Sequence, residues 1–279
     1  MAIIQWFPGH MAKALRQVKE NLKLVDVVLE LVDARLPESS RNPQLKDLLQ
    51  DKPSIIVLTK MDLADPKETR KWIEYYEKMG QPAVAINSVQ GSLKVIDKKI
   101  KEVLAEKLAN KKARGILSQR IKVMCIGIPN VGKSTLLNHL VKKNVAQVGN
   151  RPGVTKSQQW LKAGKDLQLL DTPGILWPKF EDQTVGQHLA FTGAIRDELI
   201  QSTELALDLI EFLTENYPGT LNQHYHVEER QPSVDTLRQL AEVRGCIGRG
   251  SEPDFDKAAS LLLDDFRNAR LGRITVERP

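Results

Sequence analysis

The sequence predicts an α/β domain with a mostly parallel, six-stranded sheet and helices on both faces, followed by a small all-α domain. Three observations lead to this fold class. Short apolar runs alternate with helix-periodic segments as far as Pro178, which is typical of a parallel sheet with helical crossovers. A glycine-containing phosphate-binding pattern, Gly127–Ser134, joins one such run to a helical segment. Beyond Pro178 only helical periodicity remains.

Six apolar runs, several of them β-branched, are expected to be strands because each ends at a polar or glycine-containing loop. They are Asp26–Asp33, Ser54–Leu58, Pro82–Asn87, Lys122–Gly127, Gln158–Lys162 and Leu167–Asp171. The last two flank a turn at Gly164, so we expect an antiparallel hairpin at one sheet edge. The helices between the strands are expected over Met11–Leu24, Pro66–Lys78, Ser92–Asn110 and Ser134–Lys142.

The end of the strand-like pattern divides the chain into residues 1–178, the expected sheet domain, and residues 179–279, the expected helical domain. Helices in the second domain are expected over Thr184–Ala194, Glu198–Asn216, Val234–Val243 and Phe255–Ala269. Arg267, Arg270 and Arg273 could present an RNA-binding edge there, although binding to a protein or bracing of the first domain would suit the same helices.

Composition limits the class of protein. The 279 residues are 41% hydrophobic and 27% charged, which is enough to build two cores. No apolar run approaches the ~20 residues needed to cross a bilayer, and the first residues lack a secretory leader, so we expect no membrane partner. Two cysteines, Cys125 and Cys246, suit a reducing cytoplasm better than a disulfide framework.

The net charge of +6 is unevenly divided. Residues 1–180 contain 31 Lys and Arg against 17 Asp and Glu, whereas residues 181–279 contain 10 against 18. The excess is greatest over Lys94–Lys122, with ten basic and three acidic residues. Because a basic surface attracts nucleic acid through counterion release, we favour contact with RNA or DNA there. A solvated lysine-rich surface would have the same composition.

The phosphate-binding pattern is the strongest single signal. Its glycines let successive backbone N–H groups face phosphate oxygens, while a lysine reaches the β- and γ-phosphates and a serine hydroxyl can ligate magnesium. The following helix would add its N-terminal dipole. The residues expected to bind phosphate are Pro129, Asn130, Val131, Gly132, Lys133, Ser134 and Thr135.

A second phosphate and metal element, Asp171-Thr-Pro-Gly174, ends the last predicted strand. An acidic residue at a strand end commonly holds magnesium, here through water, and the Gly174 N–H can contact the γ-phosphate. Thr155 lies between this element and the phosphate loop and is a candidate switch threonine. The expected magnesium ligands are therefore Ser134, Thr155 and Asp171, with an ordinary loop threonine as the alternative for Thr155.

A candidate guanine-binding motif, Thr59-Lys60-Met61-Asp62, follows the second predicted strand. The Asp62 carboxylate can accept two hydrogen bonds from guanine that adenine does not offer, and the Lys60 stem can lie along the base. Asn87 and Ser88 end the next strand, where a backbone N–H could approach the guanine carbonyl. That second assignment rests on position.

The guanine motif precedes the phosphate loop, which is the reverse of an ordinary GTPase. In this order the chain closely resembles the circularly permuted GTPases that act in ribosome biogenesis. The resemblance also covers Trp6–Met11, Asp33–Arg35, Ser39–Pro43 and Asp171–Asp182, and it is weakest in about the last sixty residues.

This resemblance implies a bacterial cytoplasmic enzyme that binds GTP and GDP and hydrolyses GTP slowly on its own. It implies binding to the precursor of the large (50S) ribosomal subunit and to ribosomal RNA, with hydrolysis stimulated by the particle and ribosomal proteins as further partners. A GTP site with a basic patch would equally suit a translational or tRNA-related GTPase, or an RNA-binding sensor in which hydrolysis is incidental.

The permuted order points to a catalytic residue. Small GTPases have a water-positioning glutamine directly after the DxxG, where this chain has Ile175. The permutation should instead bring residues just before Met11 close to Gly174. His10 is therefore the catalytic candidate, because a neutral imidazole can orient water, and the resemblance assigns the same role to the histidine of Pro-Gly-His-Met. Helix capping or RNA binding by His10 is the alternative.

Asn130 is a candidate potassium ligand. Related GTPases without the glutamine use an asparagine at this position to hold K⁺ near the β- and γ-phosphates, where it offsets developing charge. Asn-Val-Gly is also a good turn sequence, which alone could explain it. Mg²⁺ and K⁺ are thus the candidate cofactors. His224 and His226 are expected in a polar surface loop rather than in a metal site, because no third ligand lies nearby in sequence.

Overall fold

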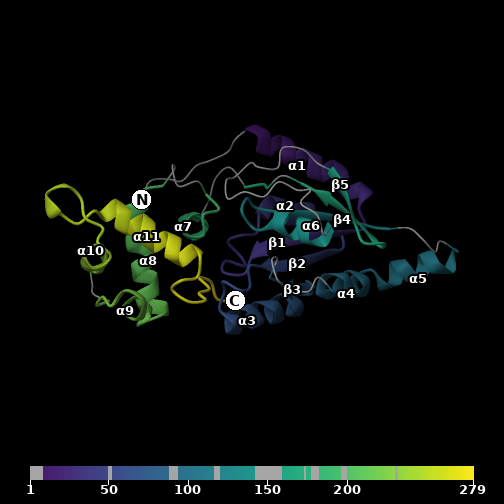
Figure 1. The fold of residues 1–279 in the computed structure, drawn as a ribbon. Helices are drawn as coiled ribbons and strands as arrows, with labels where there is room; N and C mark the ends of the chain where they lie inside the picture. The colour runs from purple at the N-terminus through teal and green to yellow at the C-terminus, as the bar shows by residue number, and fades with distance from the viewer. Residues whose placement is uncertain are drawn as a thin grey trace. The chain divides into compact units, whose positions relative to one another are not determined.

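The structure is a computed structural model that describes residues 9–49, 52–87, 94–115, 120–141, 159–172, 174–176, 182–195, 200–229 and 232–279. The chain forms two compact units (Figure 1). The helical unit is centred on Glu181–Ile274, and the sheet unit contains Gln5–Phe180 together with Thr275–Pro279. After the helical unit, the chain therefore returns to the sheet unit at Thr275.

The sheet unit has six strands in the order β3-β2-β1-β4-β6-β5. Neighbouring strands are parallel except β5 and β6, which form the expected antiparallel hairpin. The prediction of a mostly parallel six-stranded sheet is confirmed. In chain order the strands are β1 (Val27–Asp33), β2 (Ser54–Thr59), β3 (Ala83–Ala85), β4 (Ile121–Gly127), β5 (Gln159–Ala163) and β6 (Leu167–Asp171).

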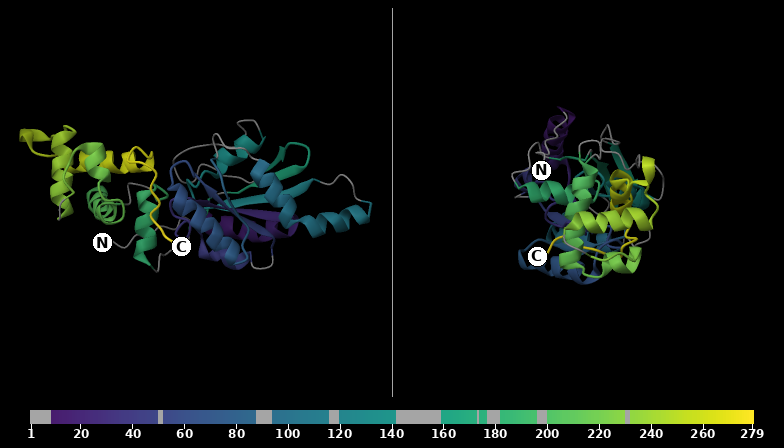
Figure 2. Two further views of the ribbon diagram at one scale, coloured as in Figure 1. Left: turned by 90° about the horizontal axis from the view of Figure 1, so that it is seen from below. Right: turned by 90° about the vertical axis from the view of Figure 1, so that its left-hand side faces the viewer.

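Helices cover both faces of this sheet (Figure 2). On one face lie α1 (Gly9–Asn21, continued by a 3-10 turn over Leu22–Leu24), α2 (Pro43–Leu48) and α3 (Pro66–Lys78). Val28 of β1 packs in a cluster with Val18 of α1, and Val32 of the same strand face packs with Trp72 of α3. The other face carries α4 (Lys94–Val103) against β2 and β3, and α6 (Lys133–Val141) against β4 and β6. All seven residues of β1 are consequently buried.

Two local predictions were wrong, and one helix was not predicted. The helix expected over Ser92–Asn110 is two helices, α4 and α5 (Ala105–Ala113), which meet at the buried Leu104. No helix was expected over Pro43–Leu48, because six residues are too few to show periodicity. The structure has α2 there, which Asn42 caps and Pro43 begins. His224 lies in the short helix α9 (Thr220–Tyr225), not in a loop.

In the described part of the helical unit, four helices pack around α8 (Ser202–Asn216), which contacts α7 (Gln183–Phe191), α9, α10 (Ser233–Val243) and α11 (Phe255–Arg267). Its core includes Leu209 and Leu213 of α8 and Leu262 of α11, all fully buried. Arg267 donates hydrogen bonds to the carbonyl oxygens of Ala190 and Phe191, which satisfies the end of α7. In the described part of the chain, no helix is both long and apolar enough to cross a membrane.

Candidate nucleotide site

The predicted motifs meet at one edge of the sheet. Asp33 ends β1, Thr59 ends β2, Gly127 ends β4 and Asp171 ends β6, and these four strands are parallel. In the register, Asp33 lies directly opposite Thr59. The carboxyl edge of a parallel sheet is where open α/β folds bind ligands. The permuted chain order therefore still gathers its motifs at a single place.

The phosphate loop has the backbone conformation that its sequence requires. Asn130 and Gly132 adopt the left-handed φ values of 59° and 92°. Gly127 has no room for a side chain, because an added Cβ would lie 2.7 Å from the Leu31 carbonyl oxygen. Lys133 is the first residue of α6 and Ser134 the second, so both lie where the helix dipole favours an anion. This backbone conformation is suited to binding an anion.

The DxxG element packs directly on that loop. A Cβ at Gly174 would lie 2.8 Å from the backbone nitrogen of Pro129, so only glycine allows this approach. The Ile175 N–H donates to the Gly127 carbonyl oxygen at 3.1 Å. The Asn42 side chain donates to the Ile175 carbonyl oxygen, also at 3.1 Å. The segment after Asp171 is thus held against the phosphate loop by its backbone.

Asp171 and Lys133 have the features of an ion and phosphate site. Both side chains are buried, and neither carboxylate oxygen of Asp171 has a hydrogen-bond partner in the described structure. Burial raises the pKa of Asp171 and lowers that of Lys133, although each charge favours the other. A cation beside Asp171 and a phosphate beside Lys133 would offset the free-energy cost of burying each of these two charges. These residues therefore fit a magnesium-bound nucleotide phosphate.

The guanine motif is tied to the phosphate loop and to β1. The Thr59 hydroxyl donates to the Val131 carbonyl oxygen at 2.6 Å. Lys60 has a left-handed φ of 55°, and its ammonium lies 3.0 Å from Asp33. Arg35 holds the same carboxylate through its Nε and Nη2 atoms at 2.9 and 2.8 Å. Strained backbone of this kind often occurs at binding sites.

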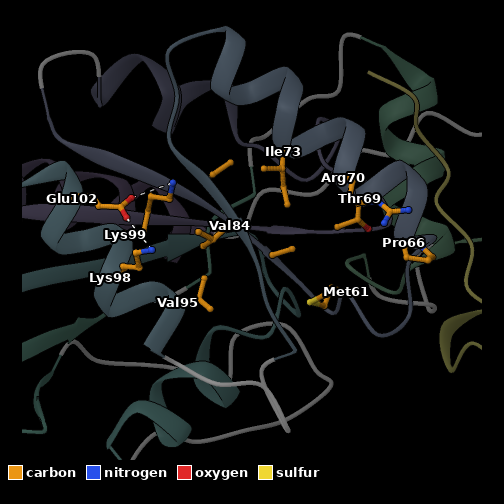
Figure 3. A pocket seen from close by; sticks show the side chains of 12 residues that line it. Met61, Pro66, Thr69, Arg70, Ile73, Val84, Val95, Lys98, Lys99 and Glu102 are labelled. Atoms are coloured by element: carbon orange, nitrogen blue, oxygen red, sulfur yellow. Dashed lines mark ion pairs between the residues drawn. The ribbon is translucent and has the colours of Figure 1, made fainter.

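The second guanine element approaches the first. The Met61 N–H donates to the Ile86 carbonyl oxygen at 3.3 Å, which brings the Thr59–Asp62 motif next to Asn87. Ser88 and Thr155 lie outside the described residues. A separate groove of about 550 Å³ lies between α3, α4 and the edge strand β3 (Figure 3). Met61 lines that groove, but none of the described phosphate-loop residues does.

His10 lies in the first turn of α1, and its side chain is outside the described part of the structure. The helix that carries it packs beside the DxxG segment, since Val18 of α1 and Ile175 share one buried cluster. The role of His10 in catalysis remains a prediction.

Two features of the site were missed by motif reasoning. Asn42 both caps α2, by accepting from the Gln44 N–H at 3.0 Å, and holds Ile175. Asp33 forms a buried ion pair with Arg35 and a second ion pair with Lys60, so one carboxylate faces two cations. All lie within segments noted only for their resemblance to permuted GTPases. Their roles depend on partners distant in sequence.

Comparison with known proteins agrees with this geometry. Residues 122–241 match the family model described as 50S ribosome-binding GTPase, and residues 48–181 match the model described as RsgA GTPase. Ribosome biogenesis GTPase A of Bacillus licheniformis is 50% identical over 279 residues, which is 99% of each chain. The chain belongs to the ribosome biogenesis GTPase A family. It is accordingly a GTPase, as its sequence predicts.

Two solved structures are similar along almost the whole chain. GDP-bound TM YlqF has a TM-score of 0.70 and 27% identity over 95% of this chain and 99% of that one. GNP-bound YlqF from T. maritima has a TM-score of 0.69 and 27% identity over 96% and 98%. These likenesses confirm the circularly permuted P-loop GTPase fold. Membership of a GTPase family also implies dependence on magnesium.

Proposed function

We propose that this GTPase is a cytoplasmic assembly factor for the large ribosomal subunit, which binds the subunit precursor and ribosomal RNA and is stimulated by them. The convergence of the guanine motif, the phosphate loop and the DxxG segment at one sheet edge supports the nucleotide part. The matching 50S ribosome-binding family and the relative named for ribosome biogenesis support the ribosomal part.

Within this proposal the site residues take the roles that their chemistry suits. Residues 129–135 and Gly174 bind the phosphates, and Thr59, Lys60, Asp62, Asn87 and Ser88 surround the guanine. Ser134, Thr155 and, through water, Asp171 hold magnesium, and Asn130 contributes to a potassium site. Magnesium would offset charge on the phosphates, while His10 orients the attacking water. The unpartnered Asp171 carboxylate is the structural observation that favours the cation most directly.

The RNA-binding surface is proposed on α4 and α5, where the basic excess is greatest. Several lysines there already pair with acids; Lys107 and Lys111, for example, lie 2.8 and 3.5 Å from Asp26. Lys112 and Arg114 are exposed at the end of α5, and the described structure shows no ion pair to either. These two are the best candidates for phosphate contacts with RNA.

The helical unit offers less basic surface than its sequence suggests. Arg267 is engaged with the end of α7, and Arg270 pairs with Asp264 and Asp265 at 2.9 and 2.7 Å. Arg273 is exposed. We propose that this unit reads the particle, through RNA or a ribosomal protein, rather than taking part in the chemistry.

The test is GTP turnover with and without purified large ribosomal subunits, with small subunits as the control. Strong stimulation by large subunits alone is expected. The double variant Lys112→Gln/Arg114→Gln should weaken binding to the particle. It should also reduce the slope of the logarithm of the binding constant against the logarithm of the salt concentration by up to about two, as expected for the loss of two phosphate contacts. Its basal turnover should equal that of the wild type. No stimulation by any RNA or particle would favour the sensor alternative.

A further inference from the structure

Residues Thr275–Pro279, called the strap below, follow the helical unit but belong to the compact sheet unit. Thr275 and Val276 are buried, with exposed fractions of 0% and 7%. The Val276 N–H donates to the Arg35 carbonyl oxygen at 2.8 Å, and the Trp72 indole donates to the Glu277 carbonyl oxygen at 3.3 Å. In Figure 1 this segment lies beside α3.

The first specific contact of the strap lies just after the guanine motif. The Asp65 N–H donates to the Thr275 hydroxyl at 3.0 Å. Asp65 in turn caps α3, because its carboxylate accepts from the Lys67 N–H at 2.7 Å. The turn between the motif and this cap is closed by a hydrogen bond from Leu63 to Lys60. Thr275 therefore fixes the point at which the guanine-binding loop ends.

The second contact lies on the other side of the motif. The Glu277 carboxylate accepts backbone N–H bonds from Glu38 at 2.7 Å and from Ser39 at 2.9 Å. The next residue, Ser40, accepts a hydrogen bond from the Asp33 N–H at 2.9 Å. The carboxylate of Asp33 carries the ion pair to Lys60. Glu277 is thus connected to the guanine motif through the turn that supports Asp33.

We propose that the strap positions the guanine-binding loop from both sides and thereby slows release of guanine nucleotides. Thr275 and Glu277 are positioning residues, since neither belongs to the Thr59–Asp62 motif. Charge-assisted bonds to a backbone turn are among the stronger hydrogen bonds in proteins, and Glu277 makes two of them. The inference rests on the proposed role of Asp62 in reading guanine.

The experiment measures dissociation of a fluorescent GDP analogue from the full-length protein, chased with excess unlabelled GDP. Glu277→Gln and Thr275→Val should each accelerate release by roughly three- to tenfold, the range expected for loss of one or two hydrogen bonds. Thr275→Ser retains the hydroxyl and should restore the wild-type rate. Glu74→Gln, at an exposed position on α3, is the matched charge-removing control and should release GDP at the wild-type rate.

The preference of the protein for one base over another tests whether the strap positions the guanine-binding loop or only stabilises the fold. IDP lacks the exocyclic amine of GDP, so a displaced Asp62 should reduce the preference for GDP over IDP. We expect this preference to fall in Glu277→Gln and Thr275→Val and to persist in Glu74→Gln. A lower melting temperature with unchanged release and unchanged preference in both strap variants would overturn the proposal. Absence of a GDP preference in the wild-type protein would instead reject the role of Asp62.

Discussion

The Thr59 hydroxyl lies 2.6 Å from the Val131 carbonyl oxygen, a contact between residues 72 positions apart. It joins the motif assigned to the base with the loop assigned to the phosphates. Thr59 also lies opposite Asp33 in the β1–β2 pairing. This one residue therefore links the Thr59–Asp62 motif, the phosphate loop and the end of β1. The loops proposed to bind the two ends of the nucleotide are therefore joined directly to each other.

Thr59→Val should weaken binding of both GDP and GTP. The substitution leaves the buried Val131 carbonyl without its partner, which costs about 1–3 kcal/mol and should destabilise the phosphate loop. Titration with a fluorescent GDP analogue measures the effect, and about tenfold weaker binding is expected. Thr59→Ser keeps the hydroxyl and should bind nearly as the wild type does. Equal affinity of Thr59→Val and wild type would show that the contact is dispensable.

Gly174→Ala should impair turnover more than folding. The added Cβ would lie 2.8 Å from the Pro129 nitrogen, so the DxxG segment must move away from the phosphate loop. A loss of GTP turnover of at least about tenfold is expected. Gly115→Ala is the control, because alanine would be strained at the left-handed φ of 76° but its Cβ would meet no atom within 4 Å. Full turnover in Gly174→Ala would contradict the close packing.

His10→Ala should sharply reduce GTP turnover on large ribosomal subunits while changing nucleotide affinity by no more than a few-fold. The reason is that His10 is assigned to the attacking water and not to binding. His226→Asn is a suitable control, because His226 is an exposed histidine with a left-handed backbone that asparagine tolerates. Normal stimulated turnover in His10→Ala would remove His10 from the mechanism.

Turnover should be faster in potassium than in sodium at equal ionic strength. The left-handed Asn130 in the phosphate loop is the residue proposed to help hold the ion. Asn130→Ala should lower the rate in potassium towards the rate in sodium. Parallel assays of GTP hydrolysis in the two salts measure this, and identical wild-type rates would end the potassium hypothesis.

Acid should destabilise the sheet unit partly through Asp33. Burial raises the pKa of this carboxyl, but Arg35 and Lys60 outweigh it and hold the pKa well below 3.8. As the pH falls, Asp33 is therefore protonated in the unfolded state before it is protonated in the folded state. The contribution of Asp33 to the free energy of unfolding is complete above about pH 4 and declines as the pH falls further. Urea unfolding between about pH 5 and 2.5 should show a smaller pH dependence for Asp33→Asn. Identical slopes would exclude Asp33 as a source of acid sensitivity.

The sheet and its main motifs could be predicted because their signals are local. Each strand is an apolar run, and the phosphate loop and the Thr59–Asp62 motif are contiguous patterns at strand ends. The helix α2 could not be predicted, because its six residues show no periodicity and its stability comes from the Asn42 cap and packing of Leu45.

The contacts that position the site could not be predicted either. Asn42 and Ile175 are 133 residues apart, and Asp65 and Thr275 are 210 apart, so no sequence window contains either pair. An asparagine before a proline indicates a helix start, and a threonine in an extended segment indicates nothing specific. Their function arises only when the fold brings the partners together.

The return of the chain from the helical unit to the sheet unit at Thr275 affects the order of events during synthesis. Thr275 is made 95 residues after Phe180, which is on the order of 5 to 20 seconds at usual rates of translation. During that interval the nascent nucleotide domain has its sheet and motifs but lacks the segment that spans Asp65 and the Glu38–Ser39 turn. Guanine nucleotide bound by this nascent domain should therefore exchange quickly, and long-lived binding should begin only once the helical unit has been made.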